Sequence, residues 1–597
     1  MPKKLPSINY TNRDFNSIRD DLMEYAKRYY PDTYKDFSQP SFGALMVDTV
    51  AYVGDVLSFY VDYQANESFL STAIEYNNVL RLAKQYGYKF SPSASSSGVL
   101  TLFIMIPVKA STTAPDRDFF PVVRRGSKFI SNSNNIFTLV EDVDFSKTNN
   151  EIVVAQVDST SGAPTAYAVK AYGQVISGEF AVQDISVGSY EKFRRLKLSA
   201  NNIAEVISVV DSKGNRYYEV DYLSQNIIYV PSANTDSNKE AVPNVIKPVV
   251  VARRFILDQD STGTYLQFGF GSEENPVRLK DPTEVILELH GKDYETDKSF
   301  DPSILNETDK LGVAPSNTIL TVVYRFNTTR NVNAAARTIT RAHEASLRFE
   351  TQETLSLSKK QFVQNSLEAF NEEAIMGDVS LPSSTEIKHR AMGSYAAQNR
   401  AVTKQDYIAM VYRLPSKYGS VKRAALVQDN DSFNERNLNL YVVSEDISSG
   451  ILTKTPSTLK NNIKTWIEQY KMINDTVDIL DAKIVNIGVN FVATPMPGSS
   501  KSDMIASAVR AITAYYRRGF DIGEPVLMTD IWSILKNIPS ILDVISVDIS
   551  VREGAGYSNL GFNVLDAKSA DGRMITAPND TIFEIRFPSR DIVGTSK

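Results

Sequence analysis

The sequence predicts a multidomain α+β protein with a helical N-terminal region, a β-rich middle and a C-terminal α/β domain that contains two strand-helix-strand units. Length is the first reason, because 597 residues make about four domains at a typical size of roughly 150 residues each. With 42% hydrophobic residues, the chain can build a core in each domain. The second reason is the hydrophobic period, which changes from helical to alternating near residue 98 and becomes mixed after residue 332.

Residues 1–90 form the helical N-terminal region. Thr11 and Asp14 are spaced as T-x-x-D, which resembles a capping box at the start of an amphipathic helix, and a later helical stripe runs from Phe69 to Gly87. Apolar stripes of this kind are shared with partner helices in a bundle or buried in the chain's own core, and periodicity alone favours neither. The candidate interaction residues are Phe15, Ile18 and Leu22 in a first stripe and Val53, Leu57 and Tyr60 in a second.

Residues 98–332 form the predicted β-rich domain. The polar segment 91–98 breaks the helical pattern, and short runs rich in β-branched residues follow it, as at 99–106 and 203–210. No repeat of fixed period is present, which argues against a solenoid or a propeller.

Residues 333–430 are expected to form a mixed α/β connector, with helical spacing over 333–348 and 360–375. Residues 431–597 are expected to form the C-terminal α+β domain, in which strands and helices alternate. Trp466 lies on an apolar helical stripe opposite Lys460 and Lys464, so a core position is favoured over a subunit contact.

Composition argues against several classes of protein. Lys and Arg number 64 against 70 Asp and Glu, giving a net charge of −6 without a basic stripe, so we expect no nucleic-acid partner. The absence of cysteine excludes disulfides, thiolate zinc sites and a cysteine nucleophile. The three histidines, at positions 290, 343 and 389, are too far apart for a metal motif. The strongest apolar run, 99–108, is interrupted, so we expect neither an export signal nor a membrane span.

Two acidic segments resemble the opening of a calcium loop. Asp258, Asp260 and Gly263 have the required spacing, but the twelfth position is Gly269 instead of the bidentate Glu, which favours a β-turn. A second acidic segment departs further from the pattern and reads as a solvated loop; it contains Asp429, Asp431 and Asn434.

Other candidate sites match the patterns of known binding or catalytic motifs equally poorly. The G-F-G at 269–271 lacks the third glycine of a phosphate-binding loop and favours a tight hairpin. The acidic neighbours at 273–274 and 372–373 point apart on a regular strand or helix, as adjacent side chains do. We therefore assign no catalytic, cofactor-binding or metal-binding residue, expect no cofactor, and expect that the protein is not an enzyme.

One segment carries a family resemblance. The sequence R-A-V-T-K-Q-D-Y, followed by an expected strand at 421–427, resembles the central signature of the baseplate J-like family of contractile phage tails. The pieces at 69–73, 268–271 and 538–544 occur in the family's order, whereas 327–332 departs from its usual turn. The residues of the signature are Arg400, Ala401, Val402, Thr403, Asp406 and Tyr407.

The resemblance implies a structural baseplate wedge protein of the virion, assembled in the host cytoplasm. It is similar to the large wedge subunits of myovirus-type phages, which form the inner ring around the tail hub, join wedges and help couple baseplate rearrangement to sheath contraction. The implied partners are a second copy, through dimer and ring contacts of residues 431–597, other baseplate wedge subunits and the small sheath-initiating baseplate subunit, with no membrane.

Two alternatives stay open from the sequence. One is the equivalent baseplate subunit of a contractile injection or secretion machine. The other is a β-rich glycan-binding or glycan-cleaving tail protein, to which the many tyrosines could belong, although the missing solenoid repeat argues against it.

Overall fold

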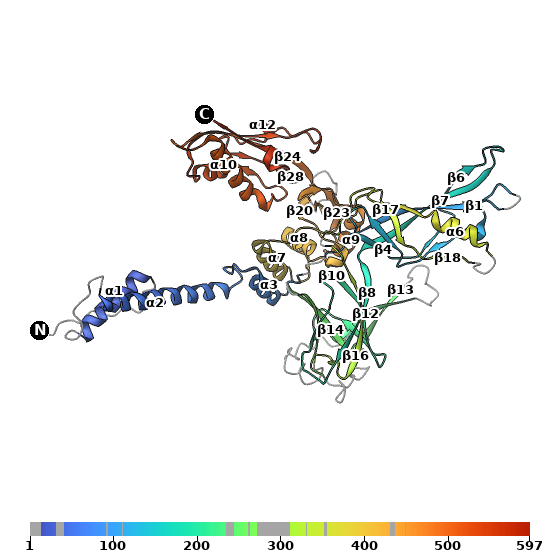
Figure 1. Cartoon of the computed structure of the whole chain (residues 1–597), viewed down its shortest axis with the longest axis horizontal. Coiled ribbons are helices and arrows are strands. Elements are labelled where there is room, and N and C mark those ends of the chain that lie inside the picture. Colours follow the sequence, from blue (N-terminus) through green and yellow to red (C-terminus); the bar gives the residue numbers. More distant parts are fainter. Residues whose placement is uncertain are drawn as a thin grey trace. The chain divides into compact units, whose positions relative to one another are not determined.

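The computed structural model describes residues 14–30, 41–90, 94–109, 112–233, 244–260, 263–271, 311–329, 331–350, 355–429, 436–447 and 449–597. It confirms the predicted fold class, with helices first, sheets in the middle and an α/β region at the C-terminus (Figure 1). Contacts divide the chain into two units. One consists of Met1–Lys89 with Pro382–Tyr395, and the other of Phe90–Leu381 with Ala396–Lys597.

The first unit is helical, and its elements are α1 (Phe15–Tyr29), α2 (Phe42–Glu67), α3 (Tyr76–Gln85) and most of α7 (Ser384–Ala397). The expected capping box is wrong, because Asp14 itself caps α1 by accepting a hydrogen bond from the Ser17 amide, and Thr11 lies outside the described residues. The third predicted stripe is interrupted by a turn before α3. There the buried Glu67 carboxylate accepts hydrogen bonds from the amides of Ile74 and Glu75, at 2.7 and 3.2 Å.

The second unit begins with a sheet whose strand order is β17-β3-β4-β7-β1-β19, with β6 paired to β7. Its long central strands, β1 (Ser97–Pro107) and β7 (Pro164–Ser177), pair antiparallel along their length. The other strands are β3 (Lys128–Ser131), β4 (Ile136–Leu139), β6 (Glu151–Val157), β17 (Ile339–Glu344) and β19 (Glu368–Phe370). Beside the sheet lie α6 (Leu357–Asn365), the 3-10 turn η1 (Arg117–Phe119) and the small sheet of β2 (Val122–Val123), β5 (Val143–Asp144) and β18 (Leu347–Arg348).

A second seven-stranded sheet is inserted between β7 and β17, in the order β8-β16-β10-β11-β14-β15-β9. Its strands are β8 (Glu179–Val187), β9 (Arg195–Lys197), β10 (Ile203–Asp211), β11 (Arg216–Glu219), β14 (Arg254–Asp260), β15 (Gly263–Phe268) and β16 (Thr318–Phe326). A separate hairpin consists of β12 (Ile227–Ala233) and β13 (Asn244–Val250). The inserted sheet has its own core, in which Tyr217, Phe255 and Phe268 are fully buried.

The helix predicted over 333–348 is wrong, because this segment forms β17 and β18. Ile339 pairs with Ser131 and is fully buried in the core of the first sheet, so long-range pairing decides the conformation. The helix predicted over 360–375 is correct only in part, since α6 ends at Asn365 and β19 follows. The first sheet therefore extends past residue 332, where we expected the β-rich domain to end.

The C-terminal part contains the two predicted strand-helix-strand units. In the first, β21 (Asn437–Asp446) and β23 (Thr476–Asp481) pair in parallel, and α9 (Ser457–Glu468) is the crossover helix between them. In this subdomain, β20 (Arg423–Gln428) and β22 (Ile451–Thr453) also pair with β21, and α8 (Lys404–Tyr412) and the 3-10 turn η2 (Ser416–Tyr418) precede β20.

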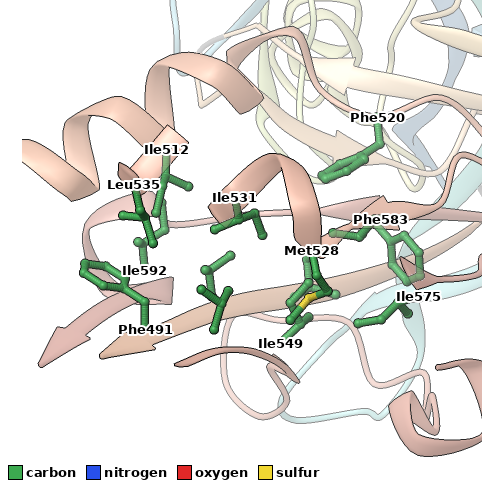
Figure 2. Packing of buried hydrophobic residues seen from close by; sticks show 14 of the residues in the cluster. Phe491, Ile512, Phe520, Met528, Ile531, Leu535, Ile549, Ile575, Phe583 and Ile592 are labelled. Atoms are coloured by element: carbon green, nitrogen blue, oxygen red, sulfur yellow. The ribbon is translucent and has the colours of Figure 1, made fainter. Parts of the chain in front are cut away.

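The second unit is built on β24 (Lys483–Pro495), which pairs antiparallel with β26 (Ile541–Val551) and parallel with β28 (Thr581–Glu584) and β29 (Ile592–Ser596). Figure 2 shows Ile512 of α10 (Lys501–Tyr515) and Ile531 and Leu535 of α11 (Met528–Lys536) packed towards Phe491 and Ile592 of the sheet. Short elements complete it: η3 (Tyr516–Arg518), β25 (Val526–Leu527), α12 (Val564–Ala567), β27 (Met574–Ile575) and α13 (Pro588–Asp591).

Candidate functional site: helix α2 and the α8 signature

Among the described residues, helix α2 has the most unusual surface. The helix is long, most of its side chains are apolar, and few of them are buried. Ser41 caps it, accepting a hydrogen bond from the Ala44 amide at 3.1 Å. Of its 26 residues only Ala44, Ala51 and Glu67 are buried. Burying apolar surface is the main source of folding and association energy, so a bare apolar helix indicates a missing neighbour.

One face of α2 carries small residues and faces α1. Ala44, Ala51 and Gly54 lie on this face, and Ala44 and Ala51 are completely buried. The Ile18 side chain of α1 lies so close to Gly54 that a Cβ there would be 3.2 Å from its Cδ1. An ion pair of 2.7 Å between Arg19 and Asp48 adds to the contact. Small residues thus let α1 approach closely and cover one side of α2.

Two further faces of α2 carry large apolar residues. Seam A consists of Met46, Val50, Val53, Leu57 and Tyr60, which are 49–58% exposed. Seam B consists of Phe42, Leu45, Tyr52, Phe59 and Tyr63, which are 37–77% exposed. Seam A has the alternating spacing of three and four by which one helix packs along another. Seam B is spaced three, seven, seven and four, so its central residues recur once in each heptad.

The three faces are evenly distributed around the helix. At about 100° per residue, the small-residue face, seam A and seam B are separated by roughly 120°. A helix with three such faces suits the interior of a bundle, in which each face contacts one neighbour. Helix α1 provides one neighbour, and among the described residues no helix covers the other two faces.

The same helix is also long and apolar enough to span a membrane, with a mean hydropathy of 1.4 over 18 residues. This is weak evidence, because the core helix of a soluble protein or a signal sequence passes the same test. Asp48, Asp55 and Asp62 recur every seven residues between the small-residue face and seam B. Aspartates at the centre of a lipid-exposed helix cost about 2.5–3.5 kcal/mol each, so this pattern favours protein partners over lipid.

The predicted interaction residues divide into two groups. Phe15, Ile18 and Leu22 of α1 are half-buried, and Ile18 packs on α2 of the same chain. Val53, Leu57 and Tyr60 are about half exposed and belong to seam A. In the described residues the two predicted stripes therefore lie on one helical hairpin, and the second stripe is exposed.

The R-A-V-T-x-x-D-Y signature builds the start of α8. Thr403 is the N-cap and accepts a hydrogen bond from the Asp406 amide, while the Asp406 carboxylate accepts one from the Thr403 amide at 2.8 Å. This is a capping box, which satisfies two amides that a helix start leaves unpaired. Burial disfavours the charge of Asp406, but hydrogen bonds from the amides of Thr403 and Val402 outweigh this and lower its pKa.

The rest of the signature anchors α8 to the segment after α9. Ala401 is fully buried and its amide donates to the Tyr470 carbonyl at 2.9 Å. The Tyr407 hydroxyl donates to the Asp475 carboxylate at 2.6 Å, and burial, together with this bond, raises the Tyr407 pKa. Arg400 and Val402 are exposed. The signature thus has a structural role in the contacts that the described residues show.

In the described part of the chain, the acidic residues considered for metal binding or catalysis do not come together in one site. Asp258 lies on β14 in an ion pair with Arg195 at 2.7 Å, and β14 pairs with β15 as a hairpin, as the β-turn interpretation expected. Glu372 and Glu373 contact Lys170 and Ser457 respectively, so they point apart as expected. Glu273, Glu274, Asp431 and Asn434 lie outside the described residues, among which no group of His, Asp and Glu could hold a metal.

The tight hairpin predicted at 269–271 is not what the described residues show. Gly271 forms a parallel bridge with Val313, and a Cβ on Gly269 would overlap the carbonyl group of Leu311. These glycines allow two segments to run side by side at close distance.

Sequence reasoning missed a buried polar junction of Ser95, Arg325, Asn333, Asp378, Lys422 and Glu445. Fully buried Arg325 bonds to Glu205 at 2.9 Å and to the Ser95 hydroxyl at 2.8 Å. Asn333 accepts hydrogen bonds from the amides of Gly377 and Asp378, both at 3.1 Å. Lys422 and Glu445 pair at 3.0 Å. No local pattern marks these residues, because their partners lie far away in the sequence.

Comparison with known proteins adds one decisive observation. Residues 14–85 match the family model of the bacteriophage baseplate protein, N-terminal domain. The match contains α1, α2 and α3, including seam A and seam B, and supports a structural role in a bacteriophage baseplate. It covers far less than half of the chain and therefore describes the N-terminal helices alone.

The remaining comparisons add little to this baseplate domain. No curated protein matches the chain. A solved structure, the cryo-EM structure of the anti-feeding prophage baseplate with six-fold symmetry, aligns over 96% of this chain and 98% of that chain at 8% identity, with a TM-score of 0.26. A TM-score this low does not show a shared fold.

Proposed function

We propose that the protein is a structural wedge subunit of a contractile phage tail baseplate and that α2 is its docking element for helices of other subunits. The observation that carries the proposal is the pair of exposed heptad seams within the baseplate N-terminal domain. Seam A extends over about four turns and seam B over about six, and each would cover one partner helix.

The proposal extends to the role suggested by the resemblance of residues 400–407. In this role the chain belongs to the baseplate of the virion, joins neighbouring wedges in the inner ring around the hub and takes part in the rearrangement that precedes sheath contraction. Its partners are a second copy, other wedge subunits and the small sheath-initiating subunit. The equivalent subunit of an injection or secretion machine would use the same seams.

The seams are tested by adding charge to them. The double variant Val53→Asp with Leu57→Asp disrupts seam A, and Tyr52→Asp with Phe59→Asp disrupts seam B. Because these side chains are exposed in the free chain, we expect unchanged melting but at least a tenfold loss of association, measured by analytical ultracentrifugation of the full chain and by incorporation into particles.

Asn66→Asp is the matched control, since it adds a carboxylate on the acidic side of the same helix. If both double variants associate and enter particles like the control, the seams are not docking surfaces. Electron microscopy of particles with the labelled chain tests the role itself, because a label on a distal fibre instead of a ring at the tail tip contradicts a wedge position.

A further inference from the structure

Glu67, the last residue of α2, places a buried carboxylate at the junction of α2 and α3. Acidic side chains are rarely buried unless partners satisfy their charge. One carboxylate oxygen accepts hydrogen bonds from the amides of Ile74 and Glu75, and the other accepts one from the Asn78 side chain at 2.8 Å. The Asn78 side chain also donates to the Glu67 carbonyl oxygen at 2.5 Å. Glu67 therefore joins the end of α2 to the first turn of α3.

The segment between the two helices, 68–75, is packed and hydrogen-bonded in its own right. Leu70 and Ala73 are buried, and the Ala73 amide donates to the Phe69 carbonyl at 2.9 Å. The segment is thus a compact turn, and the Glu67 side chain bonds across it.

Helix α7 contacts both this turn and the end of α3. The Lys388 ammonium of α7 donates to the Ser71 carbonyl at 3.1 Å. The rings of Tyr86, which follows α3, and Tyr395 of α7 meet edge to face with their centroids 5.6 Å apart. The turn, α3 and α7 therefore form one packed group within the first unit.

Glu67 is held in its ionised form. The hydrogen bonds from the Asn78 side chain and the Ile74 amide lower the pKa of Glu67 despite its burial, and the positive charge of Lys388 adds to this effect. Hydrogen bonds to an ionised acceptor are roughly twice as strong as those between neutral groups. The junction therefore depends on the charge of Glu67 as well as on its position.

The direction of α2 depends strongly on this junction. Among the described residues, α1 is the element that packs extensively on α2, and α1 belongs to the same hairpin. Thr49 lies 18 residues before Glu67, which is roughly 27 Å along a helix, so a rotation of about 20° at the junction would move it by roughly 9 Å. Small changes at Glu67 are thus amplified at the seams.

We infer that the Glu67 carboxylate is a latch that fixes the direction of the α1–α2 hairpin relative to α3 and α7. The inference rests on the proposed function in one respect, since it takes α2 as the docking helix whose direction matters. A fixed direction reduces the ordering cost of binding, because the seams meet their partners already oriented. Opening the latch would leave both seams intact but let the hairpin swing.

The chain's lack of cysteine allows this direction to be measured with paired spin labels in the full-length protein. The substitutions Thr49→Cys and His389→Cys, both at exposed positions, place one label on α2 and one on α7. Double electron–electron resonance, with an excess of unlabelled chain to suppress distances between copies, gives the distribution of distances. We expect a narrow distribution with Glu67 in place and one at least twice as broad in Glu67→Ala.

Two further variants and a matched control make the result specific. Asn78→Ala removes the donor and should broaden the distribution as Glu67→Ala does. Glu67→Gln keeps an acceptor for the two backbone amides but replaces the oxygen that faces Asn78, so an intermediate width is expected. The control Glu75→Gln removes an exposed carboxylate beside the same turn and should leave the width unchanged.

Circular dichroism shows whether each variant is folded, and Asn78→Ala with Glu67→Gln decides the test if Glu67→Ala is not. The inference is overturned if the folded variants are as narrow as Glu75→Gln, or if the distribution is already broad with Glu67 in place. Failure of the proposed function is a separate result, because Val53→Asp with Leu57→Asp should leave the distances unchanged whether or not association is lost.

Discussion

The indole nitrogen of Trp466 lies 2.8 Å from the carbonyl oxygen of Met410, so α9 is hydrogen-bonded to α8 through a side chain that also packs on Tyr470. Trp466 is half-buried against the core that contains Tyr407 and Ile463. This arrangement supports a core position within the chain, as the stripe on α9 predicted, and places the signature helix and Trp466 in one packed group.

Replacing Trp466 tests this arrangement. Trp466→Ala removes the ring and the hydrogen bond, and we expect a loss of about 3 kcal/mol in the free energy of unfolding of the C-terminal part. Trp466→Phe keeps most of the packing and should cost about 1 kcal/mol. Chemical denaturation monitored by circular dichroism measures both. Unchanged melting with weaker association would instead make α9 part of a subunit contact.

Thr403 should matter for stability and not for chemistry. Thr403→Ala removes the N-cap of α8, and we expect a cost of about 1 kcal/mol, whereas Thr403→Ser keeps the hydroxyl and should be nearly neutral. Val402→Ala, at an exposed neighbouring position, is the control for denaturation. Loss of function by Thr403→Ala at unchanged stability would show that the signature does more than cap a helix.

Replacing Arg325 tests whether the polar junction stabilises the folded chain. Arg325→Met leaves the partly exposed Glu205 carboxylate and the buried Ser95 hydroxyl without their partner, and we expect a cost of about 2 kcal/mol. Arg325→Lys should recover only part of this loss, because a lysine cannot form the same set of bonds. Thermal melting compares both variants with Arg341→Met, a change at an exposed arginine on β17. Equal melting of Arg325→Met and Arg341→Met would contradict a stabilising junction.

Sequence reasoning succeeded where the determining contacts are local. The stripe of Val53, Leu57 and Tyr60 predicted a helix, and the β-branched run at 203–210 predicted β10, because the pattern of side chains along an element is a local property. It failed for 333–348, where the pairing of Ile339 with Ser131 decides the structure.

The candidate site was predictable in part for the same reason. Three residues of seam A, Val53, Leu57 and Tyr60, could be predicted from their spacing, but seam B and the small-residue face were recognisable only once α1 was seen on one side of α2. The polar junction had no signal at all, since Arg325 and Ser95 are 230 positions apart.

Asp378 should make stability depend on pH. Burial raises its pKa to about 7, and the charge of Glu445 acts in the same direction. The unfolded carboxyl titrates near 3.9, so between pH 4 and pH 7 the folded state holds a proton that the unfolded state has lost. The contribution of Asp378 to the free energy of unfolding is therefore fully present below about pH 4 and is lost as pH rises through about 7.

The variant Asp378→Asn mimics the protonated carboxyl and should remove this dependence. We expect its melting temperature, relative to the unmodified protein, to rise between pH 4 and pH 8. Lys422 and Glu445 are unchanged in both proteins, so their ion pair does not contribute to the difference. Asp571→Asn, at an exposed position, is the control. A pH-independent difference would mean that Asp378 ionises normally.

Deleting α1 and α2 distinguishes two roles for these helices, which either dock to partner subunits or complete the chain's own core. In the described residues α1 is the element that packs extensively on α2, and the two form a hairpin through the small-residue face. A deletion of residues 1–66 removes both helices but keeps Glu67, whose carboxylate accepts hydrogen bonds at the start of α3. We expect the shortened protein to stay folded with nearly unchanged melting of its sheets, and to lose association with helical partners. Calorimetry and sedimentation measure the two properties on the same sample. Aggregation of the shortened protein, or a much lower melting temperature, would mean that the helices complete the chain's own core and that the open seams are covered from within.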